Sequence, residues 1–411
     1  MSKEIYELIK KYANMMMEQE YSVGENPRIY VKAEGYCFAT VEGADFANLM
    51  ETDIGQVALP NSIETKLILA DNDINALVVS NTPYCDQCAK QGKEIYAVLD
   101  DMAQIVGYKV ETVDYSQGQV TKALKKATGC LIKGQYTLST GRNLYEAVVA
   151  MTVLEKAAEV CLKVDVLGGG KKIPKIEAVL MRQIYKKKYS KAEQTVKTAE
   201  QKGQAQQEIQ AEAKPIYAVS PEEQEKRERL VEYGIKLVNC GLVQGTWGNL
   251  SMRLDDKYML VTPSGLDYTR LTPADMVKVQ IDSLEYDGDR KPTSEKGLHG
   301  GIFASRSGIG AAIHTHSKYC SIFAAAGKPM PIEDPEMQKI FGKSVDIAKY
   351  GLPGTKGLSK NTISALGTNF GCIMTNHGMI CCGEDMETAF NNCVKLEECG
   401  RKYIEKRFER I

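Results

Sequence analysis

The stretch Ile313-His314-Thr315-His316-Ser317 follows an apolar run that begins at Gly310. The run predicts a short strand that enters a core, and side chains at positions i and i+2 of a strand point to the same face. Both imidazoles are therefore expected on one face. A third histidine, His377, follows another apolar run, and the whole chain has only 4 histidines. Three neutral imidazoles from two strands can hold a divalent ion and leave it open to substrate.

An isolated His-x-His pair is weak support for a metal site, because surface strands often carry histidines. The choice between the two interpretations therefore depends on the rest of the chain.

The composition is that of an ordinary soluble globular protein. The chain has 411 residues, of which 43% are hydrophobic and 26% are charged. This length suggests roughly two or three domains. A net charge of −1 provides no long-range field that would attract nucleic acid or an anionic membrane. The start of the chain has no apolar signal segment and no apolar run is long enough to span a bilayer, so we expect a cytoplasmic protein.

The 12 cysteines are few for a long chain, and most lie in apolar runs. Buried thiols in a reducing compartment fit this pattern better than disulfides do. Cys85-Asp86-Gln87-Cys88 is a single C-x-x-C motif without a second pair. A redox or zinc role for this motif stays open, but packing is the favoured interpretation.

The second half of the chain repeats patterns of the first half. Tyr36-Cys-Phe-Ala-Thr-Val-Glu-Gly matches Tyr258-Met-Leu-Val-Thr-Pro-Ser-Gly at an offset of 222 residues. Two later pairs of segments match at offsets of 235 and 242, namely Ala76–Cys85 with Ala311–Cys320 and Ala123–Gly141 with Ala365–Gly383. The growing offset indicates longer loops in the second copy. Two homologous domains are therefore predicted.

A polar segment separates the two copies. From Tyr185 to Lys214 the sequence is repetitive in Lys, Gln, Glu and Ala, a composition that cannot bury a core of its own. Ser220-Pro221 marks the end of this segment, since Pro is common at the first position of a helix. We predict a first domain over residues 1–184, a linker over residues 185–221 and a second domain over residues 222–411.

The first copy lacks every proposed ligand. The alignment places a different residue opposite each histidine: Val79 opposite His314, Asn81 opposite His316, and Gln135 opposite His377. A site that needs imidazoles cannot hold its ion through these side chains, so the first copy is expected to be free of metal and without catalytic activity.

Three motifs between the linker and the histidines combine glycine with small hydroxyl or amide residues. Backbone N–H groups and hydroxyls that converge at a helix start suit a phosphate. Each motif alone is explained as well by turn or N-cap chemistry. The motifs are Gly245-Thr-Trp-Gly-Asn249-Leu-Ser251, Val261-Thr262-Pro263-Ser264-Gly265, and Pro292-Thr293-Ser294-Glu295 with His299 four residues on.

In combination with the histidines, these motifs resemble the class II aldolase/adducin family, which includes L-fuculose-phosphate aldolases and L-ribulose-5-phosphate 4-epimerases. The resemblance covers roughly Glu222 to Ile411. It implies a three-layer α/β/α domain around a mainly antiparallel sheet. The first copy looks like a degenerate domain of the same fold, so the fold is expected twice in tandem.

The resemblance also implies a role for each site residue. His314, His316 and His377 would hold a zinc ion, although another divalent ion such as Mn²⁺ stays open. Glu295 matches a glutamate that serves as general base and as a ligand of the resting metal. His299 matches a histidine outside the metal shell, for which we expect a packing or supporting role. The substrate phosphate would be bound by Asn249, Ser264, Gly265, Thr293 and Ser294.

The residue types agree with aldolase chemistry. Cleavage of a C–C bond next to a ketone produces an enediolate, which Zn²⁺ can stabilise while a carboxylate moves the proton and a phosphate pocket orients the substrate. We therefore predict a zinc-dependent aldolase that releases dihydroxyacetone phosphate and an aldehyde from a phosphorylated ketose.

Four alternatives stay open. Epimerases of the family typically carry aspartate where this chain has Glu295, so the glutamate favours an aldolase. Against this, the fuculose aldolases place a catalytic tyrosine soon after the position of Pro331, and this chain has no tyrosine there. A pentulose-phosphate 4-epimerase, a dehydratase or a decarboxylase therefore remains possible. A non-catalytic, adducin-like assembly protein is the alternative from another class.

The expected partner is a small sugar phosphate, with no nucleic acid or membrane. Sites of the family lie between neighbouring subunits of a ring of four. We therefore expect a homo-oligomer, in which two chains with two domains each could reproduce that ring.

Overall fold

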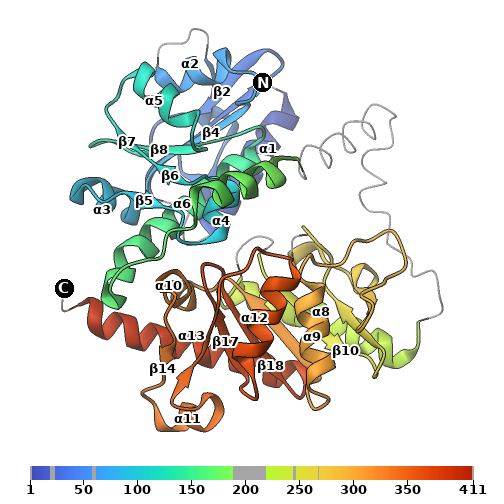
Figure 1. Cartoon of the computed structure of the whole chain (residues 1–411). Helices are drawn as coiled ribbons and strands as arrows, with labels where there is room; N and C mark the ends of the chain where they lie inside the picture. The colour runs from blue at the N-terminus through green and yellow to red at the C-terminus, as the bar shows by residue number, and fades with distance from the viewer. Residues whose placement is uncertain are drawn as a thin grey trace. The chain divides into compact units, whose positions relative to one another are not determined.

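A computed structural model of the chain describes residues 2–18, 24–57, 62–187, 219–243, 247–266 and 268–409. The chain divides into two compact units, drawn from blue to green and from lime to red in Figure 1. Unit 1 comprises Met1–Leu162 and Lys172–Lys188, and unit 2 comprises Lys163–Lys171 and Tyr189–Ile411. The predicted linker over residues 185–221 lies mostly outside the described residues, so the predicted domain boundaries stay predictions.

Unit 1 alternates helices with short strands. Its helices are α1 (Lys3–Glu18), α2 (Ile63–Ala70), α3 (Pro83–Gln91), α4 (Asp100–Ile105), α5 (Gln117–Leu124) and α6 (Leu144–Lys163), with a further helix over residues 175–187. Its strands are β1 (Glu25–Ala33), β2 (Tyr36–Thr40), β3 (Ile54–Val57), β4 (Ala76–Asn81), β5 (Ile95–Tyr96), β6 (Lys109–Val110), β7 (Thr112–Val113), β8 (Gly129–Ile132) and β9 (Thr137–Gly141).

Unit 2 follows the same plan with longer loops. Its helices are α8 (Pro221–Asn239), α9 (Lys296–Ser305), α10 (Lys318–Ala326), α11 (Pro335–Phe341), α12 (Lys356–Leu366) and α13 (Met386–Phe408). Its strands are β10 (Asn249–Arg253), β11 (Tyr258–Val261), β12 (Val277–Gln280), β13 (Ala311–Thr315), β14 (Met330–Pro331), β15 (Ser344–Val345), β16 (Ile347–Ala348), β17 (Gly371–Met374) and β18 (Met379–Gly383).

Each unit contains one seven-stranded sheet, and the two sheets have the same topology. The strand orders are β3-β2-β1-β4-β9-β8-β7 and β12-β11-β10-β13-β18-β17-β16. In both sheets the last pair, β7 with β8 or β16 with β17, is parallel, and the other pairs are antiparallel. The predicted mainly antiparallel sheet, present twice, is therefore confirmed.

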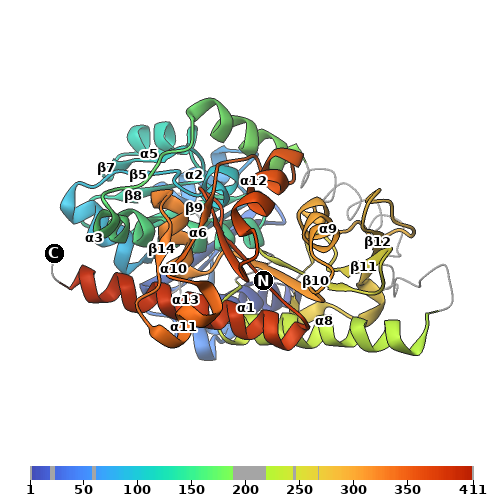
Figure 2. The ribbon, with the colours of Figure 1, turned by 60° about the horizontal axis from the view of Figure 1, so that its bottom comes forward.

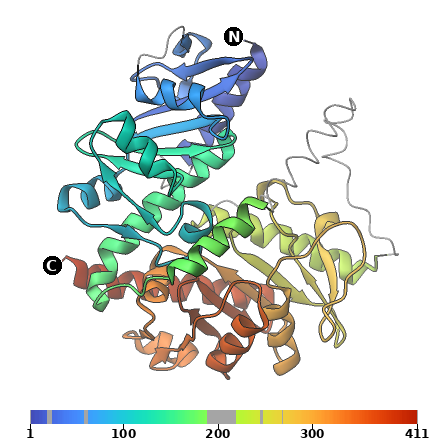
Figure 3. The same cartoon turned by 45° about the horizontal axis from the view of Figure 1, so that its top comes forward.

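In unit 1, helices cover both faces of the sheet, and β1 shows how the sequence divides between them. Ile29 and Val31 pack with apolar residues of α1 and α6, whereas Tyr30 between them packs with α2 and α5. This alternation follows from the two-residue period of a strand. Figure 3 shows α6, in green, along the strands of unit 1.

Unit 2 has the same layers. Side chains of α9 and α12, including Leu298, Ile302 and Leu358, share a buried cluster with β11, β12 and Ala312 of β13. Helix α13 packs on β13 and β18, and α8 packs on β10. Figure 2 shows α8 and α13 on the side of the sheet away from α9 and α12.

Local signals in the sequence explain where several helices begin. The predicted start at Ser220-Pro221 is confirmed, because the Ser220 side chain accepts a hydrogen bond from the N–H of Glu223 and Pro221 occupies the first helical position. The C-x-x-C motif lies on α3 with both thiols buried, which agrees with packing. No helix among the described residues combines the length and apolar character needed to cross a membrane.

Candidate active site

His314 lies on β13 and His316 directly after its end, and both project toward one side of the sheet. Asn249 of β10 lies directly opposite His314, and β18 pairs with β13 along its other edge. Ala312 packs under α9 and α12, so the two-residue period places His314 on that same side. The imidazole rings of His314 and His316 lie with their centroids 4.8 Å apart. The predicted shared face is therefore confirmed.

His377 lies in the tight turn between β17 and β18. Its backbone N–H donates to the carbonyl of Met374 over 3.1 Å, and the preceding Asn376 takes the left-handed conformation with φ of 60°. Asn is among the few residues that adopt this conformation at low cost. The turn therefore aims the imidazole back toward β13.

The three rings form a compact cluster. The centroid of the His377 ring is 4.7 Å from that of His314 and 4.7 Å from that of His316. One nitrogen from each ring lies within 4.8 Å of the others. Three converging imidazole nitrogens are a typical ligand set for a catalytic divalent metal with an open position.

Glu295, directly before α9, brings a carboxylate to this cluster. Its Oε1 lies 2.8 Å from Nε2 of His377, and its Oε2 lies 3.2 Å from Nε2 of His314. Asn249 donates from Nδ2 to Oε2 over 2.9 Å. All four side chains are buried.

The position of the proton on the His314 ring shows whether these four side chains fit a cation. Its Nδ1–H donates to the carbonyl of Met379 over 2.8 Å, which leaves a lone pair on Nε2. That buried Nε2 makes no hydrogen bond to any described residue and faces the Glu295 carboxylate. A lone pair against a carboxylate is unfavourable without a cation nearby, so the donor set fits a divalent ion.

The pKa values of these groups agree with that assignment. Burial lowers the pKa of His314 well below its ordinary value, which keeps the imidazole in the neutral, metal-binding form. Burial opposes the charge of Glu295, but the contacts with His377 Nε2 and with the amide of Asn249 outweigh it. The pKa of Glu295 is therefore held well below its ordinary value, and the carboxylate is ionised at neutral pH.

Asn249 lies at the start of β10, and the other four predicted phosphate-binding residues lie on two neighbouring loops. Thr293 donates from its backbone N–H to the carbonyl of Thr262 over 3.0 Å, and Ser264 donates likewise to Lys291 over 2.9 Å. Gly265 has φ of 78°, in the left-handed region that favours glycine. The segment that leads into α9 thus pairs with the loop that carries Ser264 and Gly265, and Thr293-Ser294 directly precedes Glu295.

His299, for which the sequence predicted a packing or supporting role, lies between Ser251 and Asn249 and contacts both. One feature of the site escaped the sequence analysis. Glu397 of α13 accepts hydrogen bonds from Ser317 Oγ and from the N–H groups of Tyr319 and Cys320, and so caps α10 directly after the histidine pair. The internal repeat carried a signal for this cap, since Glu155 stands 242 residues before Glu397.

The sequence profile described as the Class II Aldolase and Adducin N-terminal domain matches residues 14–162 and 228–404, more than half of the chain. The chain belongs to the class II aldolase and adducin family. One matched segment falls in each sheet-bearing half, in agreement with the duplicated fold.

Three relatives with similar sequences are named as sugar-phosphate aldolases. A 5-methylthioribulose-1-phosphate/5-deoxyribulose-1-phosphate aldolase of Rhodospirillum rubrum is 34% identical over 43% of this chain and 79% of that protein. A 5-deoxy-D-ribulose 1-phosphate aldolase of Bacillus thuringiensis serovar kurstaki is 32% identical over 44% and 85%. An L-fuculose phosphate aldolase of Escherichia coli O6:H1 is 28% identical over 43% and 81%.

The strand registers show what the first family domain has at the positions of the histidines. Val79 pairs with Leu138 as His314 pairs with Ile380, and Asn81 follows Val79 as His316 follows His314. The N–H of Gln135 donates to Ile132 in the turn that corresponds to that of His377. The registers therefore reproduce the predicted alignment, with no imidazole at any of these three positions.

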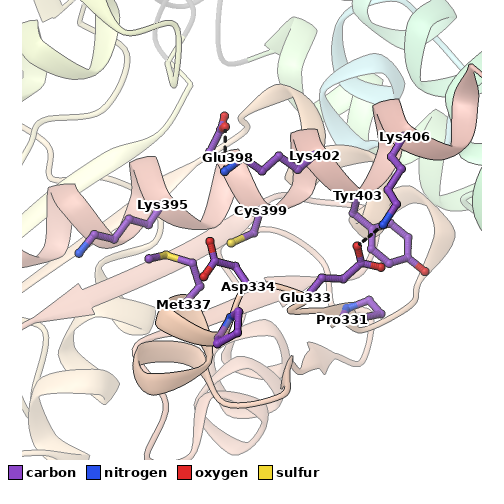
Figure 4. A pocket seen from close by; sticks show the side chains of 11 residues that line it. Pro331, Glu333, Asp334, Met337, Lys395, Glu398, Cys399, Lys402, Tyr403 and Lys406 are labelled. Carbon is purple, nitrogen blue, oxygen red and sulfur yellow. Dashed lines mark hydrogen bonds and ion pairs between the residues drawn. The ribbon is translucent and has the colours of Figure 1, made fainter.

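A groove of about 610 Å³ lies elsewhere on unit 2, along α13 (Figure 4). Lys395, Cys399 and Tyr403 of α13 line one side, and Met337 of α11 lies on the other. Its cations are largely neutralised: Lys406 pairs with Glu333, and Lys402 lies near Glu398. None of the predicted site residues lines this groove.

Proposed function

We propose that unit 2 is a divalent-metal-dependent aldolase that cleaves a ketose 1-phosphate to dihydroxyacetone phosphate and an aldehyde. The observation that carries this proposal is the cluster of three imidazoles with a carboxylate in contact with two of them. The relatives act on ribulose and fuculose phosphates, which supports a phosphorylated ketose as substrate. A phosphate on C1 places it on the three-carbon product.

His314, His316 and His377 would hold the ion, with Glu295 as a further ligand in the resting state. We propose zinc, with Mn²⁺ as the alternative, because three imidazoles suit zinc best among the common divalent ions. When bound, the ion would act as a Lewis acid toward the oxygens of the hydroxyketone.

The side chains of this chain have two further tasks. Asn249, Ser264, Gly265, Thr293 and Ser294 would hold the phosphate, which fixes the distance between it and the reacting carbons. Glu295 would move the proton at C3. In condensation the carboxylate removes it from the carbon next to the carbonyl. In cleavage the C4 hydroxyl gives up its proton as the C3–C4 bond breaks, and the carboxylate, once protonated, delivers a proton to C3, so that no proton is gained or lost overall. Because Glu295 directly follows Thr293-Ser294, phosphate binding would set the position of the base.

Unit 1 keeps the fold but has Val79, Asn81 and Gln135 at the ligand positions. We propose that it binds no ion and performs no turnover, so that each chain carries a single active site.

The test combines metal content with product release. Plasma mass spectrometry should find about one zinc per wild-type chain, and 5-deoxyribulose 1-phosphate, methylthioribulose 1-phosphate or fuculose 1-phosphate should release triose phosphate in a coupled assay. The double variant His314→Ala with His316→Ala should lose both the ion and the activity. The matched control in unit 1, Val79→Ala with Asn81→Ala, should keep both.

Each failure points to a different function. Wild-type protein that takes up no metal even after reconstitution with zinc would exclude the aldolase and favour an assembly role. Interconversion of pentulose phosphate epimers without release of triose phosphate would replace the aldolase with an epimerase.

A further inference from the structure

A buried chain of four side chains runs from the core of unit 2 to the proposed base. Ser251 Oγ lies 2.6 Å from His299 Nδ1, His299 Nε2 lies 2.5 Å from Asn249 Oδ1, and Asn249 Nδ2 lies 2.9 Å from Glu295 Oε2. Ser251 and His299 are completely buried, and Asn249 and Glu295 nearly so. Buried polar groups of this kind are costly unless each one has a partner.

The direction of every hydrogen bond in this series follows from the orientation of the Asn249 amide. Its nitrogen donates to Glu295 Oε2, so its oxygen faces His299. That oxygen needs a donor, which places the proton of His299 on Nε2. Nδ1 then accepts, and the Ser251 hydroxyl donates to it.

We propose that His299 is a positioning residue that fixes the amide orientation of Asn249. In this orientation one N–H of Nδ2 holds the Glu295 carboxylate, and the other remains for an oxygen of the substrate phosphate. The reversed amide would turn its oxygen toward the carboxylate and lose both interactions. This inference rests on the proposed function. It gives Asn249 two tasks, because one amide would both bind the substrate phosphate and hold the Glu295 carboxylate, and would so couple phosphate binding to the position of the base.

Unit 1 provides independent support. In the matching register, Arg28 stands where unit 2 has Asn249, and Tyr30 stands where unit 2 has Ser251. A neighbouring bond of the fold is kept, because the N–H of Ile29 donates to Thr40 Oγ1 as the N–H of Leu250 donates to Thr262 Oγ1. Unit 1, which lacks the imidazole ligands, thus also lacks the counterparts of Asn249 and Ser251 but keeps the adjacent hydrogen bond between β1 and Thr40. This difference favours a role in chemistry over a role in folding.

Two variants separate positioning from packing. In His299→Gln, the amide nitrogen can reach the place of Nε2 and donate to Asn249. In His299→Asn, the shorter amide ends near the place of Nδ1 and can contact Ser251 alone. Both variants remove the ring, so a purely structural role predicts similar losses of thermal stability and of activity for the two.

The measurements are zinc content, the dissociation constant of inorganic phosphate by calorimetry, and kcat and KM for the ketose phosphate. Zinc content should stay the same in both variants. His299→Asn should weaken phosphate binding and lower kcat/KM by roughly 10- to 100-fold, the usual range for residues that orient a metal site, whereas His299→Gln should recover most of both.

Equal losses in both variants would overturn the proposal, as would a normal phosphate affinity in His299→Asn. Phosphate binding needs no turnover, so its result is read separately from the activity. If wild-type protein binds phosphate but cleaves no ketose phosphate, the proposed aldolase function is wrong. The phosphate dissociation constants of His299→Asn and His299→Gln then still test whether His299 positions Asn249.

Discussion

The two units have the same sheet topology and differ at the positions that carry chemistry. Both sheets have seven strands in the same order, yet the imidazole positions of unit 2 hold Val79, Asn81 and Gln135 in unit 1. The shared features show what the fold requires. The unshared ones show what the site requires.

The helix cap after the central strand belongs to the shared set. Glu155 of α6 accepts hydrogen bonds from the N–H groups of Tyr84 and Cys85 at the start of α3, as Glu397 does for α10. Gly141 and Gly383 are shared as well. A Cβ at either would lie 2.5 Å from a backbone nitrogen at the start of the following helix. Both units have this capping carboxylate and this glycine, so the two residues serve the fold rather than the reaction.

The largest expected effect comes from the proposed base. Glu295→Gln should lower kcat by about 10²- to 10⁴-fold, the usual contribution of proton transfer, while the three imidazoles retain the ion. Glu155→Gln in unit 1 should leave kcat unchanged. Steady-state kinetics together with metal analysis checks both. A Glu295→Gln enzyme with normal kcat would remove the carboxylate from the mechanism.

Removing the shared cap should show how far the two units are equivalent. Glu397→Ala and Glu155→Ala each leave backbone N–H groups of a helix start without their acceptor, which should cost about 2–4 kcal/mol of the stability of the affected unit. Urea unfolding followed by circular dichroism measures the loss. Only Glu397→Ala should also release zinc faster to a chelator, because the cap lies next to His316. Equal rates of zinc release in the two variants would separate the cap from the site.

A glycine found in unit 2 alone makes room for the site. A Cβ on Gly378 would lie 2.3 Å from the carbonyl oxygen of Thr315 and 3.2 Å from Cε1 of His314, and unit 1 has Tyr136 at this position. Gly378→Ala should therefore displace the ligand strand and lower zinc affinity by roughly 10- to 100-fold in a competition titration. Tyr136→Ala is the control and should not change it. Unchanged affinity in Gly378→Ala would show that the turn relaxes freely.

The smallest expected effect concerns the N-cap residues of α13 and α6. Asp385 accepts from the N–H of Thr388 at the start of α13, whereas Asn143 accepts from Glu146 at the start of α6. The backbone N–H of Thr388 lowers the pKa of Asp385, so its stabilisation is complete above the unfolded-state value of about 3.9 and is lost as pH falls through the folded-state pKa.

Asp385→Asn should change stability at pH 7 by only a few tenths of a kcal/mol, because Asn caps about as well as Asp. It should also flatten the pH dependence of the urea midpoint between roughly pH 5 and pH 3. An unaltered slope in the variant would mean that other carboxylates dominate acid unfolding.

The sequence predicted those parts of the site that depend on local periodicity. Two histidines two residues apart on a strand had to share a face, and the repeat placed Val79 opposite His314, as the strand registers do. The fold also followed from the repeat and the family motifs.

The supporting contacts could not be predicted in the same way. The bond between His299 and Asn249 joins residues 50 positions apart, and the cap from Glu397 to Ser317 joins residues 80 positions apart. No periodicity or spacing marks the first bond, because it exists only after the helices pack on the sheet. For the cap, the internal repeat marks the residue, since Glu155 stands 242 positions before Glu397, but it does not show which groups the carboxylate contacts.

The assembly of the site from distant segments has a kinetic consequence. The contact between Glu295 and His377 spans 82 residues, and that between Asn249 and Glu295 spans 46. Contacts at such separations form late, since the intervening loops must close before the contacts can repay the lost chain entropy. An ion that needs all three imidazoles will bind only when the end of β13 and the β17–β18 turn have come together. The rate of metal uptake during refolding would therefore report when these segments of the sheet come together.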